Sequence, residues 1–192
     1  RCLGFGRFAG IVGCYNTLNL FLKRLGKQSL ASAYKINDYK RLVLNLKNLY
    51  FPKTKILVTG DGRVAKGVIE LLTQTNIKEV SKKDFLDKKF DEPIFCNLET
   101  KDYIINNSSN DFNLEHFIKN PREYSSSALR YLKETNIFIS AHYWDPSSPK
   151  IFEHEDIKDL LNLNIVGDIT CDIDGSVPTT IRSATIDSPN YW

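Results

Sequence analysis

Several features that would identify a specialised class of protein are absent from this sequence. The formal net charge is only +3, which is too small to indicate a nucleic-acid partner. The lysine pairs at 82–83 and 88–89 are explained as a solvated face. The apolar stretch 2–22 contains Arg7, Asn16, Asn19 and four glycines, which argues against a membrane span. No cleavage site of a signal peptide is visible, and we expect a cytoplasmic protein with no membrane partner.

Cysteine is scarce and methionine is missing altogether. The four cysteines lie at positions 2, 14, 96 and 171 and form no C-x-x-C motif, so disulfides and a zinc site are both disfavoured. We expect buried free thiols and no bound metal. The lack of any methionine, including an initiator, suggests a piece of a longer or processed protein.

The remaining composition and periodicity indicate one soluble α/β domain. Apolar residues make up 42% and charged residues 26% of the 192 residues, enough for a full core. We expect strands at 55–59, 77–80, 94–98, 136–140 and 163–169. We expect helices at 8–25, 36–49, 63–75, 113–118, 122–134 and 154–161. This alternation predicts a Rossmann-like, doubly wound fold, in which flanking helices cover a mostly parallel sheet and ligands bind at the carboxyl ends of the strands.

The most informative segment is 55–72, KILVTGDGRVAKGVIELL. A short apolar run ends at Gly60, and an apolar helical pattern begins at Val64. The spacing Gly60-x-Gly62-x-x-Ala65 fits the dinucleotide fingerprint, in which glycines let backbone approach a pyrophosphate. Free N–H groups and the positive end of the helix dipole would hold the phosphates without a dedicated cation. A strand–helix turn without a ligand is the alternative explanation.

The end of the second predicted strand bears on the choice of cofactor. Dinucleotide folds usually place Asp or Glu there, where it binds the ribose hydroxyls. This sequence has Ser81 followed by Lys82 and Lys83, a set that suits the 2′-phosphate of NADP. Asp84 or Glu79 could instead bind the ribose of NAD, or the lysines could simply be surface residues, so both NAD and NADP stay open.

Two other loops follow predicted strands and could carry chemistry. His142, beside Tyr143 and Trp144, could donate a hydrogen bond or move a proton, although packing explains all three residues equally well. Asp168, Asp172 and Asp174 follow the last strand, and on extended backbone Asp172 and Asp174 would share a face. The D-x-D-G pattern resembles a calcium loop, but the remaining oxygen ligands and the closing Glu are missing.

Three segments and the tail resemble the lysine-forming saccharopine dehydrogenases and the related lysine–oxoglutarate reductase domains, which belong with alanine dehydrogenase and pyridine nucleotide transhydrogenase. The matching segments, spread over nearly the whole chain, are Arg1-x-x-x-Phe5-Gly6-x-x-Ala9-Gly10-x-x-Gly13, Gly60-Asp61-Gly62-Arg63-Val64-x-Lys66-Gly67, Gly167-Asp168-Ile169-x-Cys171-Asp172-Ile173-Asp174-Gly175-Ser176 and Thr185-Ile186-Asp187-Ser188-Pro189.

The resemblance implies a two-domain enzyme with its reaction in the cleft. Residues 1–50 would hold helices entering from an absent substrate domain, and 51–192 an NAD(P)-binding domain with the start of an exit segment. Arg1 and Arg63 match family positions near the cofactor phosphates, while Asp168 and Asp172 match positions near the nicotinamide. Ser81 departs from relatives that carry Asp.

The implied reaction is hydride transfer between NAD or NADP and the C–N bond of an amino-acid derivative, with saccharopine giving lysine and 2-oxoglutarate. The catalytic residues would come from the absent domain, which leaves His142 a weak candidate. An alanine-dehydrogenase-like enzyme and a non-catalytic nucleotide-binding module are the alternatives, and a homo-oligomer is compatible with each of them.

Overall fold

The computed structural model describes residues 5–27, 30–47, 49–109 and 111–191; the candidate residue Arg1 lies outside these ranges. At its centre is a parallel sheet of β1 (Lys55–Thr59), β2 (Lys78–Glu79), β3 (Ile94–Leu98), β6 (Ile137–Ser140) and β7 (Ile165–Asp168). The strand order is β2-β3-β1-β6-β7. The predicted Rossmann-like α/β class is therefore confirmed.

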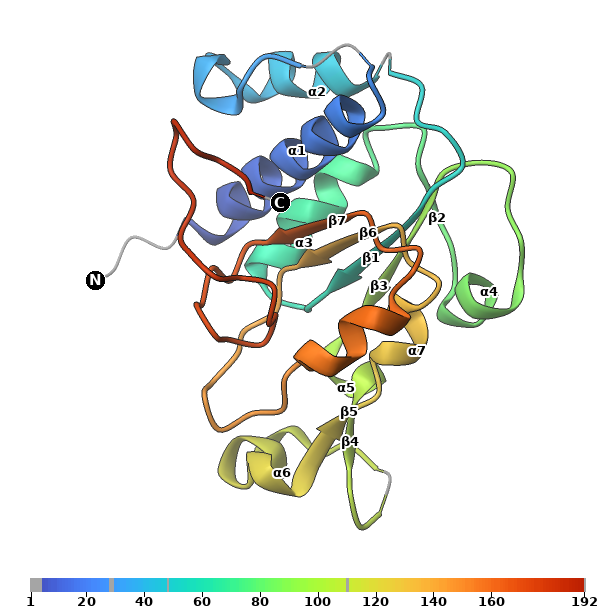
Figure 1. The fold of residues 1–192 in the computed structure, drawn as a ribbon, viewed down its shortest axis with the longest axis vertical. Helices are drawn as coiled ribbons and strands as arrows, with labels where there is room; N and C mark the ends of the chain where they lie inside the picture. Colours follow the sequence, from blue (N-terminus) through green and yellow to red (C-terminus); the bar gives the residue numbers. More distant parts are fainter. Residues whose placement is uncertain (1–4, 28–29, 48, 110, 192) are drawn as a thin grey trace.

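Helices cover both faces of this sheet (Figure 1). α1 (Gly6–Arg24) and α3 (Arg63–Leu72) lie on one face, and α2 (Tyr39–Lys47) packs outside α1. α4 (Lys82–Asp87), α7 (Leu129–Leu132) and the 3₁₀ helix η3 (His154–Asp159) lie against the other. A second 3₁₀ turn, η1 (Ala33–Lys35), precedes α2.

The strands are apolar on both sides because each face buries its own core. Ile56 and Val58 point into the cluster formed with α1 and α3, whereas Leu57, between them, points into the opposite cluster. All three are fully buried. Burying one such side chain contributes about 1.5–3 kcal/mol, and burial on both faces explains the continuous apolar run.

Helix α1 packs against α3 at backbone distance. A Cβ atom at Gly10 would lie 2.0 Å from the Val64 carbonyl oxygen, and one at Gly67 would lie 2.1 Å from the Arg7 carbonyl oxygen. Outside this crossing the Arg7 guanidinium donates two hydrogen bonds, of 2.7 and 2.6 Å, to the Glu70 carboxylate. That pair is exposed and adds little stability, so the glycines set the helix spacing.

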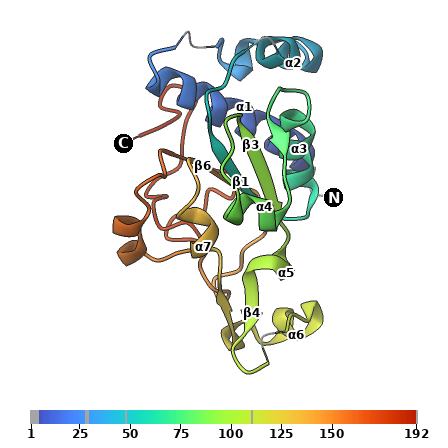
Figure 2. The same ribbon diagram turned by 90° about the vertical axis from the view of Figure 1, so that its right-hand side faces the viewer.

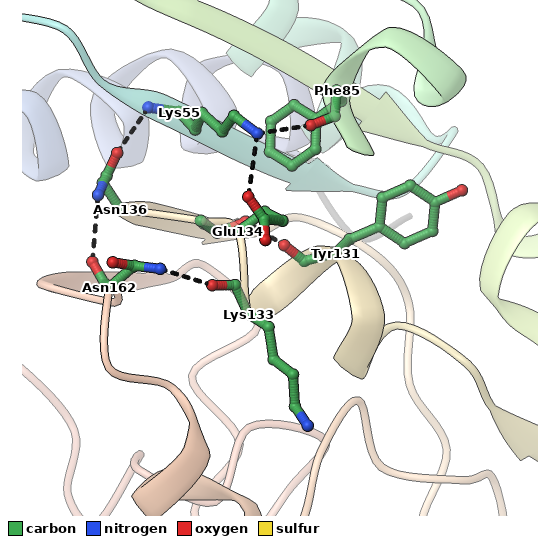
Figure 3. Close-up of polar contacts among 8 residues, drawn as sticks. Lys55, Phe85, Tyr131, Lys133, Glu134, Asn136 and Asn162 are labelled. Atoms are coloured by element: carbon green, nitrogen blue, oxygen red, sulfur yellow. Dashed lines mark hydrogen bonds and ion pairs between the residues drawn. The ribbon is translucent and has the colours of Figure 1, made fainter. Parts of the chain in front are cut away.

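Polar side chains hold the amino ends of β1 and β6 together, at the edge opposite the predicted site (Figure 3). Asn136 Oδ1 accepts a 2.8 Å hydrogen bond from the Lys55 backbone N–H. The Lys55 ammonium donates to the Phe85 carbonyl oxygen at 2.7 Å and lies 3.2 Å from a Glu134 carboxylate oxygen. These contacts tie β1 to α4 and to the segment leading into β6.

A small lobe extends from the sheet, as Figure 2 shows. It contains α5 (Thr100–Tyr103), β4 (Ile104–Asn106), α6 (Leu114–Lys119), η2 (Pro121–Glu123) and β5 (Tyr124–Ser126), with β4 and β5 antiparallel. The predicted helix at 122–134 is wrong over its first part, where η2 and β5 lie, and only α7 within it is α-helical. Three consecutive serines at 125–127 favour other backbone conformations, and Ser126 Oγ donates to the Ile151 carbonyl oxygen at 3.0 Å.

Other differences from the predicted elements concern boundaries and short helices. The predicted helix 36–49 is shortened to α2, and helix 154–161 is a 3₁₀ helix over 154–159. The strands predicted at 77–80 and 163–169 are reduced to β2 and β7, while 55–59 and 94–98 match β1 and β3. Among the described cysteines, Cys14 and Cys96 are buried free thiols as expected, but Cys171 is exposed.

The close packing of α1 against α3 at Gly10 and Gly67 leads to a prediction about stability. Gly67→Ala would drive a Cβ into the Arg7 carbonyl, so the free energy of unfolding should fall by roughly 1–3 kcal/mol, as for other overpacked sites. Lys66→Ala, at the exposed neighbouring position, is the control and should change little. Urea denaturation of both variants checks this, and equal stability would show that α1 does not pack as described.

Candidate functional site

The carboxyl ends of β1, β3, β6 and β7 meet at one edge of the sheet. From β1 the chain crosses to β2 and β3 on one side, and then returns to β6 and β7 on the other. Because the direction of winding reverses beside β1, this edge holds the topological switch point, where doubly wound folds bind their ligands. The turn after β1 lies at that point.

Gly60 shapes the turn because no other residue fits there. Its φ is +118°, and an added Cβ would lie 2.5 Å from the Ala141 carbonyl oxygen after β6. Its N–H donates to the Leu98 carbonyl oxygen at the end of β3, at 2.9 Å. The turn is therefore in direct backbone contact with both neighbouring strands.

Gly62 has a different part in the same turn. Its φ of −81° and ψ of −171° suit any residue, and an added Cβ would also meet nothing within 4 Å. The space beside Gly62 is therefore open, in front of the first turn of α3. No side chain caps α3 in the described structure, so its first backbone N–H groups have no intrahelical acceptor and remain able to bind an anion.

The two residues after Gly62 lie where the fingerprint predicts. Arg63 is exposed at the first position of α3, and Val64 is half-buried against the α1 core. A Cβ atom at Gly6, in the first turn of α1, would lie 3.1 Å from the Arg63 Cβ. The turn, α3 and α1 thus form one packed unit at this edge.

Ser81 and Lys82 lie at the edge of the sheet, separated from β1 by β3. Ser81 is the N-cap of α4, and its Oγ accepts a 3.0 Å hydrogen bond from the Asp84 N–H. The Lys82 ammonium lies 2.5 Å from the Asp102 carboxylate. Both side chains thus have structural partners, and their predicted contact with the cofactor stays a prediction.

Glu99, which is not among the site residues predicted from the sequence, follows β3 and therefore lies beside the Gly60 turn. Its carboxylate forms a 2.7 Å ion pair with Lys101, and 42% of its side chain is exposed. The pairing with Lys101 lowers the pKa of Glu99 below its usual value, so the group is ionised at neutral pH. The usual dinucleotide pattern places an acid after the second strand, whereas here the third strand lies next to β1.

His142 is buried between β1 and the loop at 175–177. Its Nδ1 lies 2.8 Å from Thr59 Oγ1 and its Nε2 lies 2.9 Å from Ser176 Oγ. Burial lowers the pKa of His142 to about 4, against a small opposing effect of the Asp168 charge. The imidazole is thus neutral and enclosed, and packing explains it better than proton transfer.

The predicted aspartate cluster is not extended. Cys171 and Asp174 have φ values of 60° and 56°, so residues 171–174 form tight turns and Asp172 and Asp174 do not share a strand face. Asp168 is held by two threonines: Thr170 Oγ1 and Thr180 Oγ1 each donate to it at 2.6 Å. Asp168 therefore orders the loop after β7, while Asp172 is exposed.

A cavity of about 840 Å³ lies along α1, β7 and the last segment of the chain, not at the glycine turn. Asp168 and Thr180 line it, together with Thr17 and Tyr191, but no residue of the 60–64 turn does. Its size alone therefore does not mark it as the site of the dinucleotide.

Comparison with known proteins gives one distant relative. The chain is 24% identical, over an alignment of 234 residues, to alpha-aminoadipic semialdehyde synthase of Arabidopsis thaliana. The alignment covers 100% of this chain but 22% of that protein, so the chain spans about a fifth of the length of the relative. No protein-family model matches. The alignment supports a distant relation to that synthase.

The described residues contain no group of three or more His, Cys, Asp or Glu side chains placed to hold a metal ion. Within the same ranges, no helix has the length and apolar character needed to cross a membrane.

His142 should make stability depend on pH. His142 takes up a proton near pH 6.5 in the unfolded chain and only near pH 4 in the folded chain. The stability that depends on its neutral imidazole is therefore complete above pH 6.5 and is lost as the pH falls towards 4. The loss should reach roughly 3 kcal/mol. Urea denaturation at pH 7 and pH 4 measures it, and His142→Gln should have the shallower pH dependence; parallel profiles for the two proteins would contradict this.

The two turn glycines should respond differently to alanine. Gly60→Ala introduces backbone strain of about 1–3 kcal/mol and a clash with Ala141, so its melting temperature should fall. Gly62→Ala adds a methyl group to open space in an ordinary conformation and should leave the melting temperature nearly unchanged. Thermal denaturation compares them, and an equal loss in both variants would contradict this description of the turn.

Proposed function

We propose that this chain is the dinucleotide-binding domain of an NAD(P)-dependent oxidoreductase. The observation that carries the proposal is the open space beside Gly62, in front of an uncapped helix at the switch point. A pyrophosphate there would accept hydrogen bonds from the first N–H groups of α3, and Gly62 would permit its close approach. The exposed Arg63 would add a positive charge beside it.

The rest of the dinucleotide would extend along the carboxyl edge in both directions from this turn. The adenosine would lie towards the ends of β3 and β2, and the nicotinamide towards the ends of β6 and β7. Asp168 and Asp172 would then be near the nicotinamide end, with Asp168 acting by ordering the loop rather than by a free carboxylate. Ser81 and Lys82 would be at the outer, adenosine end.

The substrate we propose is an amino-acid derivative with a secondary amine, saccharopine in the first instance. The distant relation to alpha-aminoadipic semialdehyde synthase supports this, as do the motifs at 60–67 and 167–176. When bound, the nicotinamide would accept a hydride from the carbon next to nitrogen, and water would cleave the resulting imine to lysine and 2-oxoglutarate. The chain's own residues would bind and align the cofactor.

A substrate domain outside this chain would supply the catalytic groups. His142 is the residue that the sequence singles out in these loops, and its imidazole is buried and hydrogen-bonded at both nitrogens. We therefore expect the isolated chain to bind cofactor without measurable turnover. An alanine-dehydrogenase-like enzyme would use the same cofactor site, and a non-catalytic nucleotide-binding module would keep it without a substrate domain.

Calorimetric titration with NADH and NADPH tests the proposal. Gly62→Val places two methyl groups where the pyrophosphate would lie, so binding should weaken at least a hundredfold while the circular dichroism spectrum and melting temperature stay close to those of the parent. Thr73→Val, a substitution of similar size at the exposed opposite end of α3, is a control that should not affect binding. Failure of the parent chain to bind either dinucleotide, or binding retained in Gly62→Val, would overturn the proposed site.

A further inference from the structure

The strand order changes which residue meets the adenosine ribose. In the usual dinucleotide order, 3-2-1-4-5-6, the second strand lies next to the first, and the acid that binds the ribose follows that second strand. Here the strand next to β1 on that side is β3, and β2 is displaced to the edge. The residue placed to meet the ribose therefore follows β3, not β2.

Backbone contacts place Glu99 at this position. Thr59 and Leu98 are paired in the register of β1 and β3, and the N–H of Gly60 donates to the Leu98 carbonyl oxygen at 2.9 Å. Glu99 is the next residue and starts the loop beside the glycine turn. Its backbone N–H donates to the Asp102 carboxylate at 2.7 Å, which holds the first turn of α5 in place.

We infer that Glu99 selects NAD over NADP by accepting hydrogen bonds from the 2′- and 3′-hydroxyl groups of the adenosine ribose. The inference rests on the proposed function and names the cofactor for the same site. A carboxylate accepts hydrogen bonds from a diol, whereas it repels the doubly charged 2′-phosphate of NADP at the same position. With 42% of its side chain exposed, Glu99 can exchange Lys101 for a ligand.

The charges around Glu99 agree with this selection. The two nearby lysines are already paired, Lys82 with Asp102 at 2.5 Å and Lys101 with Glu99 at 2.7 Å. Glu99 is the main group that raises the pKa of Lys101, and the charges of Asp102 and of Asp61, in the glycine turn, act in the same direction. Ribose hydroxyls would have to replace only Lys101 on Glu99, whereas a 2′-phosphate would have to displace a carboxylate from one of these lysines and would also be repelled by Glu99.

Ser81 is less well placed for the same contact. Neighbouring strands are about 4.8 Å apart, so the end of β2 is roughly 10 Å from the end of β1, across β3. The Ser81 hydroxyl also caps α4 through the Asp84 N–H. A serine that selected NADP would have to give up this cap or bind from the outer edge of the sheet.

The experiment is a calorimetric comparison of NADH and NADPH on the parent chain and on Glu99→Gln. The parent should bind NADH at least tenfold more tightly than NADPH. Glu99→Gln removes the charge but keeps the size of the side chain, and it should weaken NADH about tenfold while NADPH binds as well as before or better. Glu92→Gln is the matched control, because Glu92 also pairs with one lysine, Lys78, at 3.2 Å, but lies before β3; it should leave both affinities unchanged.

The outcomes separate this inference from the proposed function. Equal or tighter binding of NADPH by the parent chain, or an unchanged NADH-to-NADPH ratio in Glu99→Gln, would overturn the role of Glu99 and leave the dinucleotide site standing. A ratio that shifts in Ser81→Ala but not in Glu99→Gln would assign the selection to the end of β2. Absence of binding by either dinucleotide would overturn both proposals.

Discussion

The backbone contact between Gly60 and the end of β6 is the constraint on which the candidate site depends. A positive φ at Gly60 turns the chain away from β1, and the absent Cβ lets the turn lie against the Ala141 carbonyl. The same residue donates its N–H to the end of β3. Because one glycine touches both neighbours of β1, the first turn of α3 is fixed relative to each loop at the carboxyl edge.

Polar groups extend this fixed edge towards β7. His142 bridges Thr59 and Ser176, and its ring makes an edge contact with Tyr103 in α5, at 6.1 Å between centroids. Asp168 holds Thr170 and Thr180. His142 is a weak catalytic candidate and Asp168 a candidate cofactor contact in the sequence, and in the structure both side chains are hydrogen-bonded to residues of these loops. The loops at the carboxyl edge are therefore held in place before any ligand binds.

The sequence predicted the strands that are buried on both faces and the turn that follows the first of them. β1 and β3 were found at their observed bounds because apolar runs between turn residues are a strong local signal. Glycine spacing located the turn for the same reason. The strand order could not be predicted in this way, since it depends on how a two-residue strand, Lys78–Glu79, packs at the edge. Because of that order, Glu99 rather than Ser81 lies next to the glycine turn.

Errors in the remaining prediction have local causes. The helix expected at 122–134 is split because the hydroxyl groups of three serines compete with helical hydrogen bonding, and the extended pairing of β5 with β4 is a contact between distant segments. The aspartates after β7 lie in turns because Cys171 and Asp174 adopt left-handed backbone, a conformation that a D-x-D pattern does not reveal.

The close approach of α1 and α3 has a mechanical consequence. Gly10 in α1 and Gly67 in α3 each place the backbone of one helix against the other, and Gly6 lies beside the Arg63 side chain. A displacement or rotation of the start of α1 would therefore be transmitted to the first turn of α3, so that the first helix is mechanically coupled to the glycine turn.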